Sequence, residues 1–330
     1  MTGSRCSTVL VLITAATMLA SPISRAEELA ERTVRIGFVD PVSLSSRAPI
    51  EGFWARLREL GWVEGRNLVI ETRSAEGHYE RLPALMAELV DRRVDLLVTY
   101  STTAGLAAKS ATSTIPIVDA AMGDPVRDGL AASLARPGGN LTGLSFGWSE
   151  GFGGKFLELL QDTVPRLSTV AMITNPDNPF ERAMVKEVVS AAEQRRLKLK
   201  IIPLRDPSSL QHVLEEARRQ GQALLIFGDP FLHSHRREIT AFANQHRMPA
   251  LYGMRDFVEA GGMMAYGPNT TVVWRRAAEY VDKILRGANP GELPIEQPTQ
   301  YSLTVNTKVA KALGITIPES ILLRADEVMR

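Results

Sequence analysis

Short apolar runs alternate with amphipathic stretches along most of this chain. Compact runs rich in β-branched residues predict buried strands at 34–39, 68–70, 96–98, 115–118 and 141–145. Apolar residues spaced three and four positions apart predict helices between them, near 50–60, 82–90 and 103–110. Regular alternation of strand and helix predicts a parallel sheet with helices on both faces.

The same rhythm restarts after the turn cluster Arg136–Asn140. Strands are expected at 169–173, 197–202 and 223–227, and helices at 179–195 and 208–219. The last third is less regular, with strands at 261–266 and 301–305 and helices at 273–285 and 307–313. Two stretches of similar pattern predict an α/β protein with two doubly wound parallel-sheet lobes.

The first 26 residues are typical of an export signal. A basic residue, Arg5, precedes the apolar run 8–20, and Ser24-Arg25-Ala26 has small residues at the positions a signal peptidase requires. The run is short for a membrane span, so a permanent anchor is the weaker alternative. Cys6 precedes the run, which does not suit lipidation. We therefore expect a periplasmic protein cleaved after about Ala26.

Charge and cysteine content exclude several classes of function. The chain has 38 basic and 37 acidic residues, and the first 26 contain only Arg5 and Arg25, so 36 basic residues (38 − 2) face 37 acidic ones. Such a balance gives no field to attract nucleic acid. The single cysteine is Cys6, so the mature chain has no disulfide, thiol nucleophile or cysteine-ligated metal. The remaining 304 residues (330 − 26) suffice for two domains.

The sequence contains no complete motif for catalysis or metal binding. His233 and His235 lie two residues apart, which puts them on different sides of a helix, and we expect a solvated surface pair. The glycine-rich stretch 151–155 lacks the first glycine and the hydroxyl residue of a phosphate loop, so we expect a flexible linker. No nucleophile motif is present. We expect neither a metal nor a cofactor, and no enzyme.

Several segments together resemble a known family, the ABC transporter substrate-binding proteins that include tryptophan- and tyrosine-binding members. They are the opening strand and the segments 61–67 (GWVEGRN), 123–126 (GDPV), 136–143 (RPGGNLTG), 296–299 (EQPT), 305–314 (VNTKVAKALG), 317–318 (IP) and 324–327 (RADE). The resemblance covers nearly all of residues 34–327. It implies the type I periplasmic binding protein fold, shared with branched-chain amino-acid receptors and sugar-repressor cores.

In that fold the chain crosses between the lobes three times. Carried over to this sequence, the crossings fall near 143–146, 250–254 and 300–306. The resemblance then assigns residues 34–143 and 254–300 to the N-terminal lobe, and 144–253 and 301–330 to the C-terminal lobe. The two lobes would close on a ligand about these hinges.

Ligands of open α/β sheets bind beyond the carboxyl ends of the strands. The strand at 96–98 is followed by Tyr100, Ser101, Thr102 and Thr103 at the start of a helix, where unpaired N–H groups suit a carboxylate. The alternative is that the hydroxyl groups only cap the helix. Both roles are compatible.

Further candidates lie at other strand ends and at the crossings. Four polar residues at strand ends are Asp40, Asp124, Asn175 and Asp229, and each also suits a simple turn. Asp229 is the best-placed acid to pair with a ligand ammonium, as acids do in amino-acid receptors. Three aromatic residues at or after crossings, Phe146, Tyr252 and Tyr266, are candidates for apolar cleft walls.

We therefore expect the solute-binding component of an ABC importer, acting as a monomer with permease subunits in the inner membrane. An amino acid or related organic acid is favoured, because the chain lacks an arginine signature for sugar phosphates and a tryptophan cluster for carbohydrates. Two alternatives remain open: a ligand sensor that docks on a chemoreceptor or kinase, and an exported enzyme that uses the same cleft.

Overall fold

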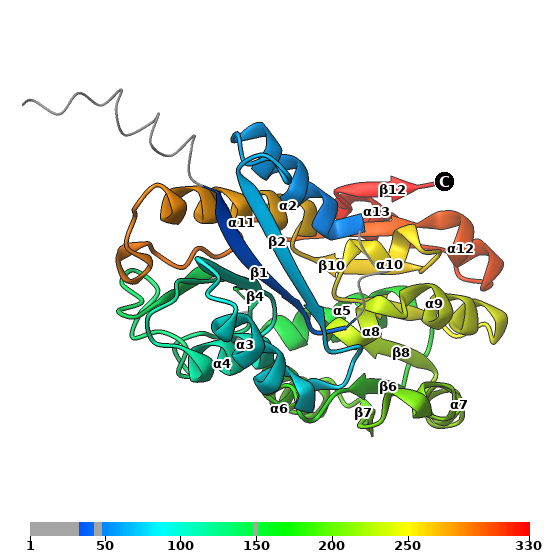
Figure 1. Ribbon diagram of the computed structural model, residues 1–330. Coiled ribbons are helices and arrows are strands. Elements are labelled where there is room, and N and C mark those ends of the chain that lie inside the picture. Colours follow the sequence, from blue (N-terminus) through cyan, green and yellow to red (C-terminus); the bar gives the residue numbers. More distant parts are fainter. Residues whose placement is uncertain (1–32, 43–47, 148–150) are drawn as a thin grey trace, which may run out of the picture.

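The computed structural model describes residues 33–42, 48–147 and 151–330, and it consists of two α/β lobes placed side by side (Figure 1). The expected export signal lies outside the described residues. The first lobe is built on a five-stranded parallel sheet in the order β2-β1-β3-β4-β5. Its strands are β1 (Val34–Asp40), β2 (Leu68–Ser74), β3 (Leu96–Thr99), β4 (Ile117–Met122) and β5 (Leu141–Ser145).

Helices cover both faces of this first sheet. α2 (Ala48–Glu59) and α11 (Thr270–Leu285) pack together on one face, and α3 (Leu82–Asp91) and α4 (Thr102–Ala111) pack on the other (Figure 1). Two short 3₁₀ turns, η1 (Tyr79–Arg81) and η3 (Pro290–Glu292), complete the lobe. This is the doubly wound arrangement expected from alternating strands and helices.

The second lobe is built on a seven-stranded sheet in the order β12-β11-β10-β9-β8-β6-β7. Its strands are β6 (Thr169–Thr174), β7 (Lys198–Pro203), β8 (Ala223–Ile226), β9 (Ala250–Tyr252), β10 (Met264–Gly267), β11 (Ser302–Asn306) and β12 (Glu327–Met329). Every pair is parallel except β10 with β11. β11 runs in the opposite direction because the chain reaches it from the first lobe.

The second sheet is also covered on both faces. One face carries α5 (Phe152–Thr163), α6 (Pro179–Gln194), α12 (Thr307–Ala312) and α13 (Glu319–Arg324). The other carries η2 (Pro207–Ser209), α7 (Leu210–Gln220), α8 (Pro230–Ser234), α9 (Arg236–Gln245) and α10 (Arg255–Glu259). The predicted fold class is therefore confirmed.

The chain passes between the two sheets three times among the elements described. It does so between β5 and α5, between β10 and α11, and between Glu296 and β11. The second position corrects the sequence expectation, which put this crossing at 250–254 and assigned 254–300 to the first lobe. β9 and β10 both pair within the second sheet, so the chain leaves it only after Gly267. A strand of three residues is too short to show a periodic pattern, so the sequence does not distinguish β9 from a crossing.

The first and third crossings touch one another. The Tyr301 hydroxyl donates to the carbonyl oxygens of Phe146, at 2.7 Å, and Gly147, at 2.5 Å. Further along, Glu296 pairs with β5 through backbone hydrogen bonds to Gly143 and Ser145. The two segments therefore run together before entering the second lobe.

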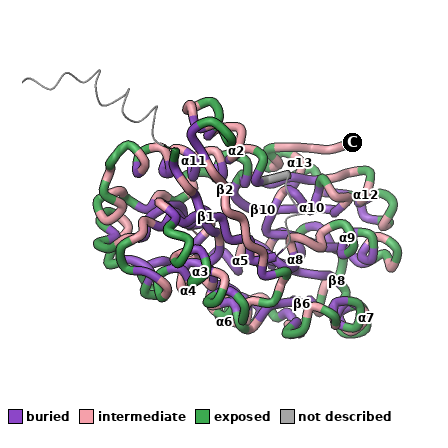
Figure 2. The backbone as a smooth tube through the Cα atoms, viewed as in Figure 1, coloured by how far each residue is buried: buried purple, intermediate pink, exposed green. Residues whose placement is uncertain are grey.

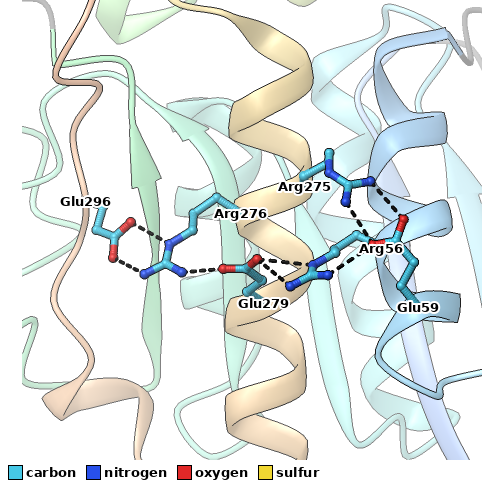
Figure 3. A network of polar contacts seen from close by, with 6 residues as sticks. All are labelled: Arg56, Glu59, Arg275, Arg276, Glu279 and Glu296. Atoms are coloured by element: carbon cyan, nitrogen blue, oxygen red, sulfur yellow. Dashed lines mark hydrogen bonds and ion pairs between the residues drawn. The ribbon is translucent and has the colours of Figure 1, made fainter.

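A network of charged residues attaches the third crossing to the helices of the first lobe (Figure 3). Arg276 on α11 binds both carboxylate oxygens of Glu296, at 2.6 and 2.7 Å, and also pairs with Glu279. Glu279 continues the network to Arg56 on α2 at 2.9 Å. Arg275, which also lies on α11, pairs with Glu59 on α2 at 2.8 Å.

One apolar cluster runs through both lobes, and the inner strands of both sheets are largely buried (Figure 2), whereas the edge strands β2, β7 and β12 are more exposed. Phe146 and Trp274 bring the first lobe into this cluster, and Met254 and Phe231 bring in the second. The lobes are therefore in contact across the cleft. No helix among residues 33–42, 48–147 and 151–330 is long and apolar enough to cross a membrane.

The glycine-rich stretch 151–155 begins α5, which corrects the expectation of a flexible linker. A Cβ at Gly153 would lie 2.9 Å from a methyl group of Val188 on α6. Gly153 is therefore needed for close packing of α5 against α6. The low helix propensity of glycine hid this helix in the sequence pattern.

Candidate ligand-binding cleft

Two cavities lie between the lobes, on either side of the turn 228–231. The large cavity has a volume of about 580 Å³ and is lined by Gly77, His78, Tyr79, Glu80 and Thr103 from the first lobe and by Asn175, Asp177, Leu204, Arg205, Asp206, Pro207, Asp229 and Phe231 from the second. The small cavity, of about 50 Å³, is lined by Val42, Ile50, Tyr100, Ser101, Ala121, Phe146, Gly228, Pro230, His233, Met254, Thr270 and Trp274. Both cavities therefore depend on the two lobes coming together.

Asp229 is the buried acid of the large cavity. It follows β8 and caps α8, because one carboxylate oxygen accepts the N–H groups of Phe231 and Leu232 at 2.9 and 3.3 Å. The other oxygen accepts the side-chain amides of Asn175 and Asn178 at 3.1 and 3.2 Å. Burial raises the pKa of Asp229, and these donors oppose the rise.

The first lobe reaches this carboxylate through Tyr79. The Tyr79 hydroxyl lies 3.3 Å from both oxygens of Asp229 and accepts the N–H of Phe231 at 3.2 Å. Burial and the neighbouring Asp229 charge raise the pKa of Tyr79 well above its usual range, so the hydroxyl stays protonated and donates. Tyr79 is therefore a polar contact that joins the two lobes.

A second acid, Glu181, lies behind Asp229. Its Oε2 accepts the Thr174 hydroxyl at 3.0 Å, while its Oε1 is buried with no hydrogen-bond partner among the described residues. Burial, together with the charge of Asp229, raises the pKa of Glu181 to about 8. At neutral pH Glu181 is thus mostly protonated, whereas the Asp229 oxygens accept four N–H groups that favour the ionised form of Asp229.

The N-terminus of α4 borders both cavities. Ser101 adopts φ 85° and ψ 146°, a strained conformation for a residue with a side chain, and its oxygen accepts the Ala104 N–H at 3.4 Å. The Thr102 hydroxyl accepts the Gly123 N–H at 3.0 Å. Thr103 lines the large cavity, and its buried hydroxyl oxygen has no hydrogen-bond partner among the described residues.

The small cavity has an aromatic wall, with a hydrogen-bonded histidine and aspartate beside it. The rings of Tyr100 and Trp274 meet edge to face at 5.3 Å. His233 lies 2.9 Å from Asp256 and has only 15% of its side chain exposed, which corrects the expectation of a solvated histidine pair. Asp256 lies on α10, 23 positions from His233 in sequence, so no local sequence pattern indicates this pair.

The chain matches the family model for "ABC transporter substrate binding protein" over residues 35–329. It belongs to this family. The fold of this substrate-binding protein is that of the type I periplasmic binding proteins. The resemblance found in the sequence is therefore confirmed.

Individual relatives are more distant. This substrate-binding protein is 24% identical over 265 residues to a "Tyrosine-binding protein" of Clostridioides difficile (strain R20291), covering 80% of this chain and 76% of the relative. It is 26% identical to a "conserved domain protein" of Vibrio cholerae, with a TM-score of 0.82, covering 90% and 100% of the two chains. It is 24% identical to an ABC domain of Streptococcus pneumoniae solved with L-Trp, with a TM-score of 0.80 and the same coverage.

The structure brings six of the predicted site residues to the cavities of the substrate-binding protein. Thr103, Asn175 and Asp229 line the large cavity, and Tyr100, Ser101 and Phe146 line the small one. Helix capping and a position at a cavity are compatible, since Ser101 and Asp229 line cavities and also cap helices. Ligand contact by the six residues stays a prediction.

The other five line neither cavity, which corrects their assignment to the cleft. Thr102 binds Gly123, and Asp124 accepts the N–H groups of Val126 and Arg127 in a turn. Asp40 accepts the Tyr100 hydroxyl at 2.7 Å and borders a separate groove beside α2. The side chains of these three residues are occupied by local hydrogen bonds.

Tyr252 and Tyr266 were expected at the cleft because the second crossing was misplaced. Tyr252 is fully buried and stacks on Phe257 at 4.5 Å. Tyr266 stacks on Phe152 at 5.3 Å, in the apolar cluster between α5 and the second sheet. Both tyrosines belong to strands of the second sheet, so their rings pack against its helices.

Sequence reasoning missed Tyr79 and Trp274. Tyr79 follows β2, and the rule on strand ends applies there as well, but a single aromatic residue in a polar turn gives no distinct signal. Trp274 lies on α11 beside residues that belong to the core, and only the tertiary structure turns it toward the cavity. Among the described residues, no group of three or more His, Cys, Asp or Glu side chains could hold a metal ion.

Proposed function

We propose that this protein is the solute-binding component of an ABC importer and that it captures an amino acid by closing its two lobes. The observation that carries the proposal is the large cavity, whose wall is shared between the lobes around the buried carboxylate of Asp229. A ligand there contacts both lobes, so its binding energy favours the closed form. Family membership supports a role in binding over catalysis.

Three features support an amino acid as the ligand. Asp229 is an acid suited to an ammonium group, and the Thr103 hydroxyl at the same cavity has no hydrogen-bond partner within the described residues. Phe231 and Leu204 offer apolar surface to a side chain. Two relatives carry names or titles that concern amino acids, tyrosine in one and L-Trp in the other.

Export and a membrane partner complete the proposal. The N-terminal segment has the pattern of an export signal, and the closed lobes would then be recognised by permease subunits in the inner membrane. Mass spectrometry of protein purified from the periplasm of a Gram-negative host tests the export step. A mature N-terminus near residue 27 is expected, and an intact N-terminus on a cytoplasmic protein would contradict it.

A thermal-shift screen of amino acids, carboxylic acids, short peptides and sugars tests the binding function. A ligand at 100 times its Kd should stabilise the protein by about 2.7 kcal/mol. Small-angle scattering with and without the best ligand then tests closure, and a smaller radius of gyration is expected for the complex. Stabilisation by sugars alone would refute the ligand class. An identical radius of gyration with and without bound ligand would refute hinge closure.

A further inference from the structure

The charged groups around the two cavities are unequally distributed. The large cavity is lined by the four acids Glu80, Asp177, Asp206 and Asp229 and by a single arginine, Arg205. Arg205 faces Asp177 at 3.5 Å, and both side chains are more than 60% exposed at the rim. A ligand in this cavity therefore meets an excess of negative charge.

The histidines at the cavities are also paired with acids. At the large cavity, His78 lies 3.3 Å from Glu80. At the small cavity, His233 lies 2.9 Å from Asp256. Every basic side chain that lines either cavity thus faces a carboxylate within the described residues, and an anionic group of a ligand would have to compete for it.

The N-terminus of α4, which could bind a carboxylate, is partly engaged within the protein, because the Ala104 N–H already donates to Ser101. The Ser101 and Thr102 oxygens accept backbone N–H groups within the protein, at Ala104 and Gly123. Asp119 is fully buried next to this helix end, and one of its oxygens has no partner among the described residues. The Asp119 carboxyl group supplies no positive charge that could attract a ligand carboxylate to this place.

The Asp229 carboxylate, next to the mostly protonated Glu181, lacks a cationic partner in the described part of the chain. Both residues are fully buried, they lie close enough to affect each other's ionisation, and no ion pair is formed by either one in the described part of the chain. The Tyr79 hydroxyl is shared between the two oxygens of Asp229 at 3.3 Å, longer than the other side-chain contacts of this carboxylate. A ligand ammonium could replace it and make shorter, charge-assisted hydrogen bonds.

We propose that the cleft selects the positive charge of its ligand and does not require a carboxylate, so that primary amines with an apolar body bind as well as the corresponding amino acids. This inference rests on the proposed function and extends its ligand class from amino acids to monoamines. The ammonium group replaces the Tyr79 hydroxyl at Asp229. The apolar body lies against Tyr79, Leu204 and Phe231.

Matched sets of ligands test this proposal by isothermal titration calorimetry at pH 7.5. One set is tryptophan, tryptamine and indole-3-propionate; the other is leucine, isopentylamine and 4-methylpentanoate. In the set that fits the cleft, the amine is expected within tenfold of the amino acid in affinity. The acid without an amine is expected to bind at least a hundredfold more weakly.

The outcomes separate the two proposals. Binding of an amino acid without binding of its amine would overturn the ligand class proposed here and leave the function standing. Equal binding of the amino acid and the acid that lacks the amine would overturn it as well. Absence of binding by all six compounds would contradict the proposed function, and this inference with it.

Two variants test whether the carboxylate of Asp229 binds the ligand amine. Asp229→Asn keeps an oxygen that can cap α8, so the fold should survive, but amine affinity is expected to fall at least thirtyfold. Glu181→Gln is the matched control, because the neighbouring Glu181 is mostly protonated at neutral pH, and amine affinity should stay within threefold. Unchanged amine affinity in a folded Asp229→Asn protein would overturn the proposal. Circular dichroism verifies folding of both variants.

Discussion

The hydroxyl of Tyr79 in the first lobe lies 3.3 Å from both carboxylate oxygens of Asp229 in the second lobe. It thereby links η1 to the start of α8 across the cleft. Gly77 approaches the same region, since a Cβ on it would lie 2.7 Å from the Phe231 ring. The segment 77–79 is thus closely fitted to the turn that separates the two cavities.

Tyr79→Phe removes this hydroxyl and keeps the ring. If a ligand amine replaces the hydroxyl at Asp229, the substitution removes a contact from the closed ligand-free form and none from the complex. Amine affinity should then rise about two- to tenfold, the equivalent of about 0.5–1.5 kcal/mol for one hydrogen bond. Calorimetry measures the affinity, and small-angle scattering should show a more open ligand-free protein.

Tyr266→Phe is the control for this substitution, because the Tyr266 ring packs in the core of the second lobe. Its affinity should equal that of the wild type. Weaker amine binding by Tyr79→Phe than by the wild type would show instead that Tyr79 stays bound to Asp229 in the complex and holds the lobes closed.

The pKa of Glu181, raised to about 8 from an ordinary value of 4.5, predicts a pH-dependent stability. Between these two values the folded state holds a proton that the unfolded state has lost, so stability falls as pH rises. The slope is at most about 1.4 kcal/mol per pH unit for one group. Asp119, with a pKa raised to about 8 by burial, adds to the effect in the same direction.

Urea unfolding between pH 5 and 8 measures this dependence. The Glu181 carboxyl faces Thr174, the Gly228 N–H and Asp229, and the last of these disfavours its ionisation. In Glu181→Gln the decline in stability with pH should be clearly shallower than in the wild type. An identical slope in the two proteins would show that Glu181 ionises normally in the folded state.

Gly143 has φ +139°, and a Cβ there would lie 2.0 Å from the Asp119 carbonyl oxygen. Gly143→Ala should therefore destabilise the protein by more than about 2 kcal/mol through clash and backbone strain. Gly139→Ala in the same segment meets no atom within 4 Å and should change stability by less than about 0.5 kcal/mol. Equal effects of the two substitutions in urea unfolding would show that β4 and β5 can separate to admit a side chain.

Arg276 holds the third crossing through its two hydrogen bonds to Glu296. Arg276→Gln should lower the unfolding free energy by about 0.5–1.5 kcal/mol, because the pair is bidentate and part of a network but partly exposed. Arg275→Gln, which loses a pair with Glu59 alone, should cost less. The difference between the two variants should shrink in 1 M NaCl, and a salt-independent difference would argue against an electrostatic origin.

The hydrophobic periodicity of the sequence was sufficient for the fold class and for most of the long elements. β1, β6 and α11 carry patterns that are long enough to identify them without knowledge of their neighbours. The rule on strand ends also located Asn175 and Asp229 at the large cavity, because such ends converge on one edge of each sheet. Short elements such as β9 were missed, since three residues show no period.

The amino-acid sequence by itself determined two α/β lobes and membership in a family of substrate-binding proteins, and it named Asp229 among several candidate ligand-binding residues. These follow from local patterns and contiguous motifs, which a chain displays before it folds. Only the tertiary structure decided where the chain returns to the first lobe, that Tyr252 lies in the core, and that Tyr79 meets Asp229. The Tyr79–Asp229 contact joins residues 150 positions apart, and it exists because two separately built sheets come together.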